Sequence, residues 1–435
     1  MRRRLQVGLV LAASAWGGAA SAQDAEAAKA APNGAEARQP EPNGAEARQP
    51  ETNEAQPRLE ATAFEGLEAE DDVALHKKKA KAKGNKLEFK GRIIARAQLT
   101  SRRLQLVGSD LRLEDRKLNS LDLSVPSARF GFHYDTHIPY VSASGSVEFL
   151  DKPKLKDAFV QAKHDGFGVR VGQFKLPGSP FETASRLSLP SAGRGFIHDI
   201  LTDRLEIGGR RPGIAGFAKL KLQKQAALEL TLGAFQGSYL KDEATRDRSL
   251  LSLQAMGAQT AVARAELALP ALQIGVTGNY RVGTSQLFQR GDETAHFWSG
   301  GVDAALDAWL GGGGLRVWAD ANLGEGWFVV DKRSASGRPI YAAVRGMAAF
   351  RVGGRERGEV YVEPYALVGG LDPDAKVTHD LAFEVAAGIS AGIWERGHLT
   401  LQGGLMRTQR NFPVSFVLPD YRDQKNLLLQ LGVQL

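Results

Sequence analysis

The sequence predicts an all-β protein, a transmembrane antiparallel β-barrel of about 16 to 18 strands, preceded by a signal peptide and a disordered tail. Three observations lead to this class. The chain opens with an export signal. Its residue types alternate with period two from Lys86 to the last residue, and no apolar run after the signal reaches 18 residues. A slightly polar mean hydropathy fits a barrel, because each strand is apolar on one face only.

The first residues predict export. A basic segment, Arg2–Arg4, precedes an apolar stretch that runs from Leu5 to Ala15. Ala20–Ala22 then offers small residues at the two positions that a signal peptidase reads, which places the cleavage before Gln23. We therefore interpret residues 1–22 as a cleaved signal peptide. A membrane anchor is the alternative, but the apolar run is too short for one.

Residues 23–85 have the composition of a low-complexity tail. A ten-residue unit, Pro-Asn-Gly-Ala-Glu-Ala-Arg-Gln-Pro-Glu, occurs at Pro32–Glu41 and again at Pro42–Glu51. Proline and glycine recur too often for a helix, and a lysine-rich stretch follows at 77–83. We expect a disordered periplasmic tail. A tether to lipid headgroups or to the cell wall stays open as its role.

The overall composition restricts the class of function. The chain has no cysteine, so its stability must come from packing and hydrogen bonds. Its net charge is +7 and its pI is near 9.4. A basic balance can indicate nucleic acid, but in an exported chain it favours an anionic solute or an anionic lipid surface. We expect no nucleic-acid partner.

Residues 86–435 carry the barrel pattern. Small or apolar residues alternate with polar or amphipathic ones in Leu315–Leu323, and the same holds in Val141–Phe149 and Val360–Val368. Successive strand side chains point to opposite faces, so each segment has one dry face and one wet face. Alternating stretches of this length can cross a bilayer when tilted. About 350 residues, at roughly 20 per strand and connector, give the expected strand number.

The alternation also assigns residues to faces. In the first strand, Leu87, Phe89 and Ile93 are expected to face lipid. A Lys or Arg that faced lipid at the bilayer midplane would cost about 2–4 kcal/mol, which constrains the register strongly. The basic residues of the wet faces should therefore line the lumen; they are Lys90, Arg92, Arg96, Arg129, Arg170, Lys219, Lys221 and Arg316.

One long connector interrupts the alternation. After the strand-like Val169–Phe174, the chain loses its period for about thirty residues and gathers prolines and arginines. We expect 175–213 to fold inward and narrow the lumen, where a lower dielectric strengthens fixed charges. An exposed loop with solvated charges is the alternative. The candidate anion-binding residues are Lys175, Arg186, Arg194, Arg204, Arg210 and Arg211.

Short motifs mark this connector and the strand ends beside it: Val171–Pro177, Phe181-Glu182, Phe196-Ile197, Asp203-Arg204 and Arg211–Ile214. In this order they resemble the phosphate-selective porin O and P family. That family has a Gly-Gln-Phe-Lys-x-Pro strand end, a nearby Glu, a constriction loop and an Arg-x-x-Gly re-entry into the barrel. The resemblance covers about forty residues in detail. It implies a 16-stranded homotrimer that takes up phosphate, polyphosphate or other anions passively.

No motif predicts an enzyme, a metal site or a cofactor. His133 and His137 share an HxxxH spacing, but on a strand this spacing does not bring both rings to one metal. His198-Asp199 and Asp203 lack a serine partner for acid–base chemistry. No Walker or Rossmann pattern occurs.

The sequence thus predicts an outer-membrane porin in contact with outer-membrane lipid, through which small anionic solutes diffuse passively. Two alternatives stay open. The barrel can be plugged, for example by residues 23–85, and serve as a structural or adhesive anchor. The chain can also be a soluble exported β-protein that binds carbohydrate, which would require paired carboxylates in a cleft.

Overall fold

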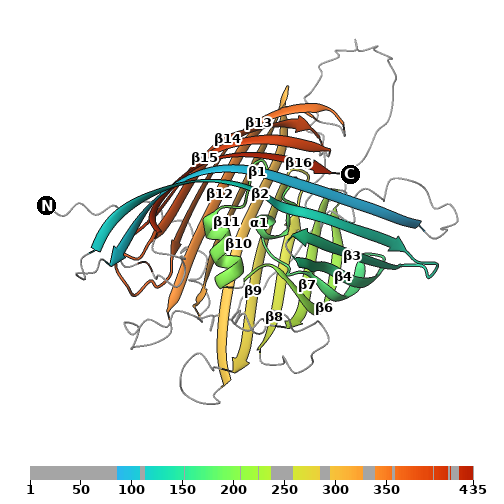
Figure 1. Ribbon diagram of the computed structural model, residues 1–435. Coiled ribbons are helices and arrows are strands. Elements are labelled where there is room, and N and C mark those ends of the chain that lie inside the picture. Colours follow the sequence, from blue (N-terminus) through green and yellow to red (C-terminus); the bar gives the residue numbers. More distant parts are fainter. Residues whose placement is uncertain are drawn as a thin grey trace, which may run out of the picture. The chain divides into compact units, whose positions relative to one another are not determined.

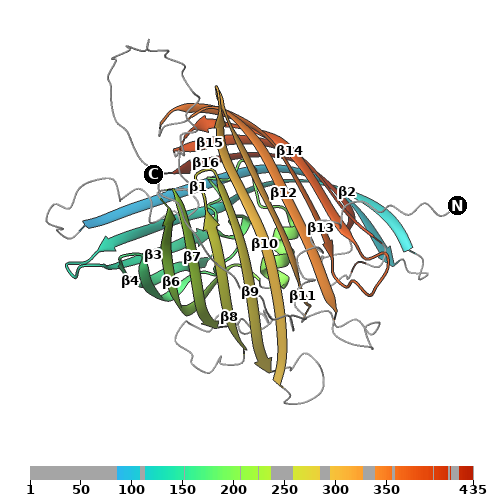
Figure 2. The same cartoon turned by 180° about the vertical axis from the view of Figure 1, so that it is seen from behind.

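The computed structural model describes residues 86–107, 113–150, 152–205, 207–223, 225–236, 258–284, 294–326, 339–354, 358–394, 396–409, 412 and 421–434. The expected signal peptide and the tail 23–85 lie outside these residues. The described strands form one sheet that closes on itself, and Figures 1 and 2 show it from opposite sides.

Sixteen strands make up this barrel, which confirms the predicted fold class. Each strand pairs antiparallel with its neighbours in the chain, and β1 pairs with β16, so the sheet has no open edge. The strands are β1 (Lys86–Val107), β2 (Leu113–Asp135), β3 (Val141–Leu150), β4 (Lys152–His164), β5 (Phe167–Lys175), β6 (Arg210–Gln223), β7 (Ala226–Gln236), β8 (Ala258–Ala268), β9 (Leu272–Thr284), β10 (Thr294–Leu310), β11 (Gly313–Glu325), β12 (Ile340–Gly353), β13 (Val360–Asp372), β14 (Ala382–Ile393), β15 (Gly397–Thr408) and β16 (Tyr421–Gln434).

The two rims of the barrel differ in their connectors. β1 begins and β16 ends at one rim, where Arg92 lies opposite Gln434, and we call it the terminal rim. Strand direction alternates, so every connector from an even-numbered to an odd-numbered strand lies at this rim. These connectors are short, such as the turn Asp165–Gly166. The long connector 176–209, between β5 and β6, therefore starts from the opposite rim, the loop rim.

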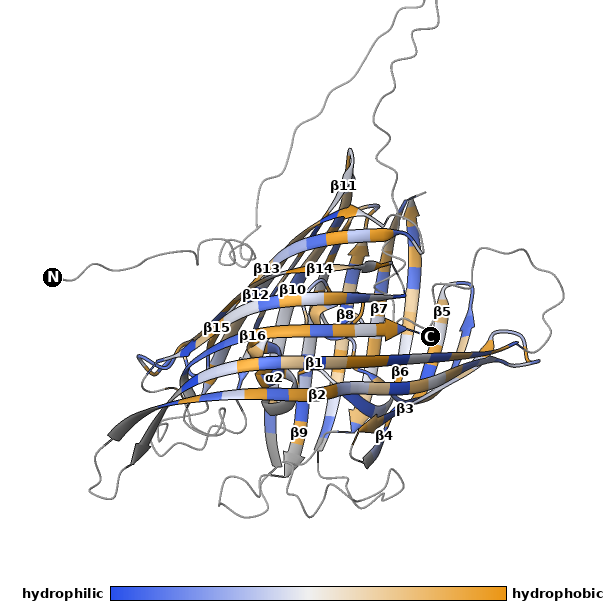
Figure 3. Cartoon of the chain, turned by 45° about the horizontal axis from the view of Figure 1, so that its top comes forward, coloured by the Kyte–Doolittle hydropathy of each residue, from blue (hydrophilic) through white to orange (hydrophobic). Residues whose placement is uncertain are grey.

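The strands point apolar side chains outward and polar side chains inward. On β1, Leu87, Phe89 and Ile93 are 53, 62 and 51% exposed, whereas on β11 Arg316 and Asp320 are buried. Figure 3 shows this alternation as orange and blue bands along the strands. A continuous outer band of large apolar side chains is unfavourable in water and suits hydrocarbon.

Helical structure in the described part of the chain is confined to the connector 176–209. It forms α1 (Pro180–Thr183), α2 (Phe196–Asp199) and a π-helical turn, η2 (Ile200–Arg204). Figure 1 shows these short elements in green, inside the barrel. None of the described helices is long and apolar enough to span a membrane.

The packed core lies between this connector and the inner wall, not between two sheets. In one cluster, Ile197 and Leu201 pack with Tyr341 on β12 and Leu371 on β13. In a second, Phe181 packs against Trp318 on β11, with ring centroids 6.1 Å apart. Burial of such side chains contributes about 1.5–3 kcal/mol each, so the connector is attached firmly to one side of the lumen.

Candidate functional site

The bends of the connector follow from its prolines and glycines. Pro180 begins α1, where its fixed φ suits the first turn and its missing N–H leaves no helical bond unmade. Gly195 precedes α2 with a φ of 90°, a value that glycine adopts without strain. A Cβ on Gly195 would lie 2.5 Å from Glu384 Oε1, so the close approach of connector and wall also requires glycine.

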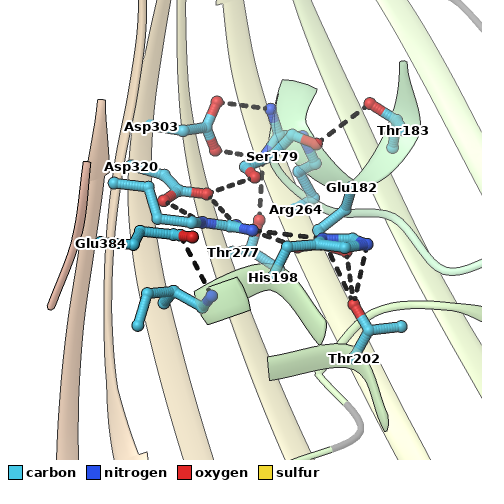
Figure 4. Close-up of polar contacts among 12 residues, drawn as sticks. Ser179, Glu182, Thr183, His198, Thr202, Arg264, Thr277, Asp303, Asp320 and Glu384 are labelled. Atoms are coloured by element: carbon cyan, nitrogen blue, oxygen red, sulfur yellow. Dashed lines mark hydrogen bonds and ion pairs between the residues drawn. The ribbon is translucent and has the colours of Figure 1, made fainter. Parts of the chain in front are cut away.

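Buried charges fix α1 to β11 and β12, as Figure 4 shows. Ser179 Oγ donates to Asp320 Oδ2 over 2.6 Å. Arg345 donates from Nε to Asp320 Oδ1 and from Nη2 to Glu182 Oε1, both over 2.9 Å. Burial opposes the Glu182 carboxylate, but the charges of His198 and Arg345 outweigh it and hold the pKa of Glu182 well below its ordinary value. Glu182 is therefore ionised at neutral pH.

The beginning of α2 is fixed to β14 by one carboxylate. Glu384 Oε2 accepts the backbone N–H of Phe196 over 2.5 Å, and Oε1 accepts that of Ile197 over 3.1 Å. These N–H groups have no acceptor within the helix, so the Glu384 carboxylate on the wall accepts their hydrogen bonds. Within the connector, His198 Nδ1 lies 3.0 Å from Glu182 Oε1, which ties α2 to α1.

The middle of the connector contacts the wall on both sides. Arg96 on β1 donates from Nη2 to the carbonyl of Ala192 over 2.9 Å, and the N–H of Ala192 donates to Gln402 on β15 over 3.2 Å. Arg316 on β11 donates to the carbonyl of Ser188 over 2.9 Å. With the helix anchors, these contacts hold the connector along the inner face from β11 round to β1.

Two cations hold the end of α1. Lys175 Nζ donates to the carbonyls of Thr183 and Ala184 over 2.5 and 3.3 Å, and Arg194 also donates to the carbonyl of Ala184. Such carbonyls carry the partial negative charge of a helix end. Burial lowers the pKa of Arg194 to about 9, and Arg186 acts in the same direction, so Arg194 keeps its charge at pH 7.

Beneath the connector, each of four arginines is paired with at least one of six carboxylates, so this surface has no excess of cations. Arg264 Nη1 lies 2.6 Å from Asp303 Oδ2, and Arg316 Nη1 lies 3.0 Å from Glu363 Oε1. Asp307 Oδ2 also lies 3.5 Å from Arg316 Nε. Charges that pair at these distances cancel most of their field in the lumen. We call this surface the matched wall; its groups are Arg345–Asp320–Glu182, Arg264–Asp303–Glu266 and Arg316–Arg351–Glu363–Asp307.

The inner face of β1–β6 carries an excess of cations around a cavity of about 100 Å³. Two carboxylates lie among them. Glu148 Oε2 is 3.1 Å from Arg129 Nη2, and Asp157 Oδ1 is 2.7 Å from Arg210 Nε. Among the described residues of this surface, seven cations therefore stand beside two carboxylates. We call this surface the basic wall; its cations are Lys90, Arg92, Arg129, Lys156, Arg170, Lys175 and Arg210.

Aromatic rings position one cation of the basic wall. The Arg170 guanidinium lies 4.5 Å from the ring centroid of Phe159 and 5.3 Å from that of Phe174. It also donates from Nε to Gln161 Oε1 over 2.8 Å. Stacking and the hydrogen bond together fix the plane of the guanidinium while leaving its charge in the lumen.

The predicted constriction residues fall into two groups. The connector spans 176–209, so it is shorter than the predicted 175–213. Three predicted residues lie on the flanking strands instead: Lys175, Arg210 and Arg211. Arg186 and Arg194 lie in the connector itself, and Arg204 belongs to η2, with a side chain outside the described part.

The predicted lumen residues separate in space. Lys90, Arg92, Arg129 and Arg170 gather in the basic wall, whereas Arg96 binds the connector and Arg316 belongs to the matched wall. Lys219 and Lys221 lie exposed on β6 toward the terminal rim, where Lys219 pairs with Glu229.

Sequence reasoning missed Lys156. Ser146 pairs with Asp157 and Val147 with Leu155, so Lys156 is the extra residue of a β-bulge. The alternation of residue types does not mark such a bulge. The partners Arg345, Asp320 and Glu384 were missed too, because they face the connector from strands far along the chain.

No family model matches this chain, and no curated protein matches it. Among solved structures, the chain resembles OprB of Pseudomonas putida, with a TM-score of 0.51 and 9% identity over 80% of this chain and 94% of that one. It also resembles an anion-selective porin from Comamonas acidovorans, with a TM-score of 0.50 and 10% identity over 81% of this chain and all of that one. At such identities the likeness shows the fold alone, which is that of outer-membrane porins.

Proposed function

We propose that this chain is an outer-membrane porin through which small anions diffuse passively. The observation that carries the proposal is the asymmetry of the lumen. The connector covers a matched wall, while the basic wall opposite keeps an excess of Lys and Arg. Solutes that pass the narrowed lumen therefore meet a surface on which cations outnumber carboxylates.

The outward apolar band supports the membrane location. Large aliphatic and aromatic side chains are exposed on the strands, while the charges named above point inward. The short turns of the terminal rim would face the periplasm and the loop rim the exterior, as in other outer-membrane barrels. A cleaved export signal at residues 1–22 is part of the same proposal.

Anion preference follows from electrostatics at short range. In a narrowed aqueous channel with low-dielectric walls, fixed charges of one sign raise the local concentration of the opposite ion. Guanidinium groups can replace part of an anion's hydration shell with directed N–H donors. The cavity of about 100 Å³ at the basic wall has room for several waters or one small anion.

Two finer parts of the proposal rest on the family resemblance of the connector. The first is that the solute is phosphate, polyphosphate or a similar anion, and the second is that the chain assembles as a homotrimer. The name of the Comamonas acidovorans structure, an anion-selective porin, agrees with the class of solute.

Solute release from vesicles tests the proposal. Vesicles that contain the protein are loaded with glucose, gluconate or glucosamine, which have nearly equal size and differ in charge. We expect gluconate to leave fastest and glucosamine slowest at low salt, with the difference shrinking at high salt as screening increases. Equal rates would overturn the anion preference, and retention of all three solutes would overturn the pore itself.

A further inference from the structure

His198 on α2 occupies the junction between the connector and the wall. Its Nδ1 lies 3.0 Å from Glu182 Oε1 and 3.2 Å from Arg345 Nη1. The side chain is only 11% exposed. Figure 4 shows the imidazole beside Glu182 of α1.

The two contacts of Nδ1 require opposite protonation states. The Arg345 nitrogen can only donate, so its bond needs a lone pair on Nδ1 and hence an unprotonated nitrogen. The Glu182 carboxylate can only accept, so its bond needs a hydrogen on Nδ1. One nitrogen cannot satisfy both partners at once.

The partners also belong to different parts of the molecule. Glu182 and His198 both lie in the connector, whereas Arg345 lies on β12. We propose that His198 is a proton-dependent positioning residue. In the neutral ring with its hydrogen on Nε2, Nδ1 accepts from Arg345 on the wall. Proton uptake then places a hydrogen on Nδ1, which forms the bond to Glu182 inside the connector and removes the bond to Arg345. That this proton uptake regulates conductance rests on the proposed pore function.

The Glu182 carboxylate and the Arg345 guanidinium act on a protonated His198 ring in opposite directions. Glu182 stays ionised because its pKa is held low, and histidine ordinarily changes charge between about pH 5 and 8. A protonated ring gains a charge-assisted bond to Glu182 and repels Arg345. The charged groups in contact with His198 are Glu182 on α1 and Arg345 on β12. Asp199 follows it on α2, Asp320 on β11 pairs with Arg345, Arg194 in the connector acts on Glu182, and Glu384 on β14 binds the first N–H groups of α2.

A spin label on the connector measures the effect of proton uptake by His198 on the mobility of the connector, and it does so without a conductance measurement. The chain has no cysteine, and a Cβ on Gly193 meets nothing within 4 Å, so Gly193→Cys gives one labelling site in open space. We expect the label to become more mobile as the pH falls from about 8 to 5. The step should vanish in His198→Gln, which keeps a polar side chain that does not titrate.

Two further variants sharpen the test. His164→Gln is the matched control, because His164 is exposed at a turn of the terminal rim and should leave the step intact. Glu182→Gln removes the carboxylate that favours the protonated ring, so its midpoint should fall by about 1–3 pH units. Heat-modifiable gel mobility verifies that each variant is folded.

The outcomes separate the two proposals. A step absent from the unmodified chain, a step retained in His198→Gln, or an unchanged midpoint in Glu182→Gln would overturn the role of His198. A step that behaves as expected in a protein that releases no solute would overturn the pore and leave the role of His198 standing.

Discussion

Glu384 on β14 accepts the backbone N–H of Ile197 on α2 over 3.1 Å, although 187 residues separate them in the chain. The connector extends from β5 to β6, and this contact joins it to the opposite side of the barrel. It explains how a segment with few helical residues keeps one position in a wide lumen.

Removal of this carboxylate should release the connector locally. We expect Glu384→Ala to lose about 1–3 kcal/mol of local stability, since it leaves the N–H groups of Phe196 and Ile197 without their acceptor. Trypsin should then cleave the folded barrel at Arg186 or Arg194 about 10 to 100 times faster. Glu88→Ala, on β1 where Glu88 pairs with Lys86, is the control and should not change the rate. Equal rates in both variants would show that Glu384 does not hold the connector.

A methyl group at Gly195 should disturb the same contact. Gly195→Ala would have to keep a φ of 90° and place a Cβ against the Glu384 carboxylate. Strain of this kind costs about 1–3 kcal/mol. The matched control is Gly193→Ala, two residues away, where the added methyl meets nothing within 4 Å. We expect faster tryptic cleavage in the first variant alone; the same cleavage in both would contradict the close approach.

Neutralising the basic wall should weaken anion preference in steps. A single charge about 8 Å from a permeating ion in water is worth about 0.5 kcal/mol, which favours an anion and disfavours a cation by roughly two-fold each, so the anion-to-cation permeability ratio changes roughly four- to six-fold. Arg92→Gln and Lys156→Gln should each lower the ratio by about this factor at low salt. Lys376→Gln, in the connector between β13 and β14, should leave the reversal potential where it is. If all three variants match the parent protein, the basic wall does not set selectivity.

The connector between β13 and β14 should make stability depend on pH. Burial raises the pKa of Asp380 to about 6, and the nearby charge of Asp372 adds to the effect. The folded state therefore favours the protonated acid, and the stabilisation present at low pH is lost as the pH rises through about 6. We expect the melting temperature to fall between pH 5 and 7, and to fall less in Asp380→Asn. An identical slope in the variant would remove Asp380 as the cause.

The sequence was sufficient to predict the barrel because a strand has a side-chain period of two. Leu87, Phe89 and Ile93 alternate with polar residues, and that alone places them outward. The lower end of the predicted strand number proved right because some strands are long: β1 has 22 residues and β2 has 23.

The site was harder to predict, because its partners meet only after the barrel closes. Arg345 and Glu384 bind the connector from strands more than 140 residues away, and no local pattern signals that contact. Lys156 was missed because a bulge shifts it out of the alternation. Sequence reasoning considered His198 only for acid–base chemistry, and the structure places it between a carboxylate and a guanidinium instead.

The reversal potential across a planar bilayer under a KCl gradient tests the central claim most directly. We expect stable conductance steps and a reversal potential shifted toward the chloride equilibrium potential. This potential should move toward zero as the salt concentration rises. A cation-selective potential, or a bilayer that stays closed with correctly folded protein, would contradict it.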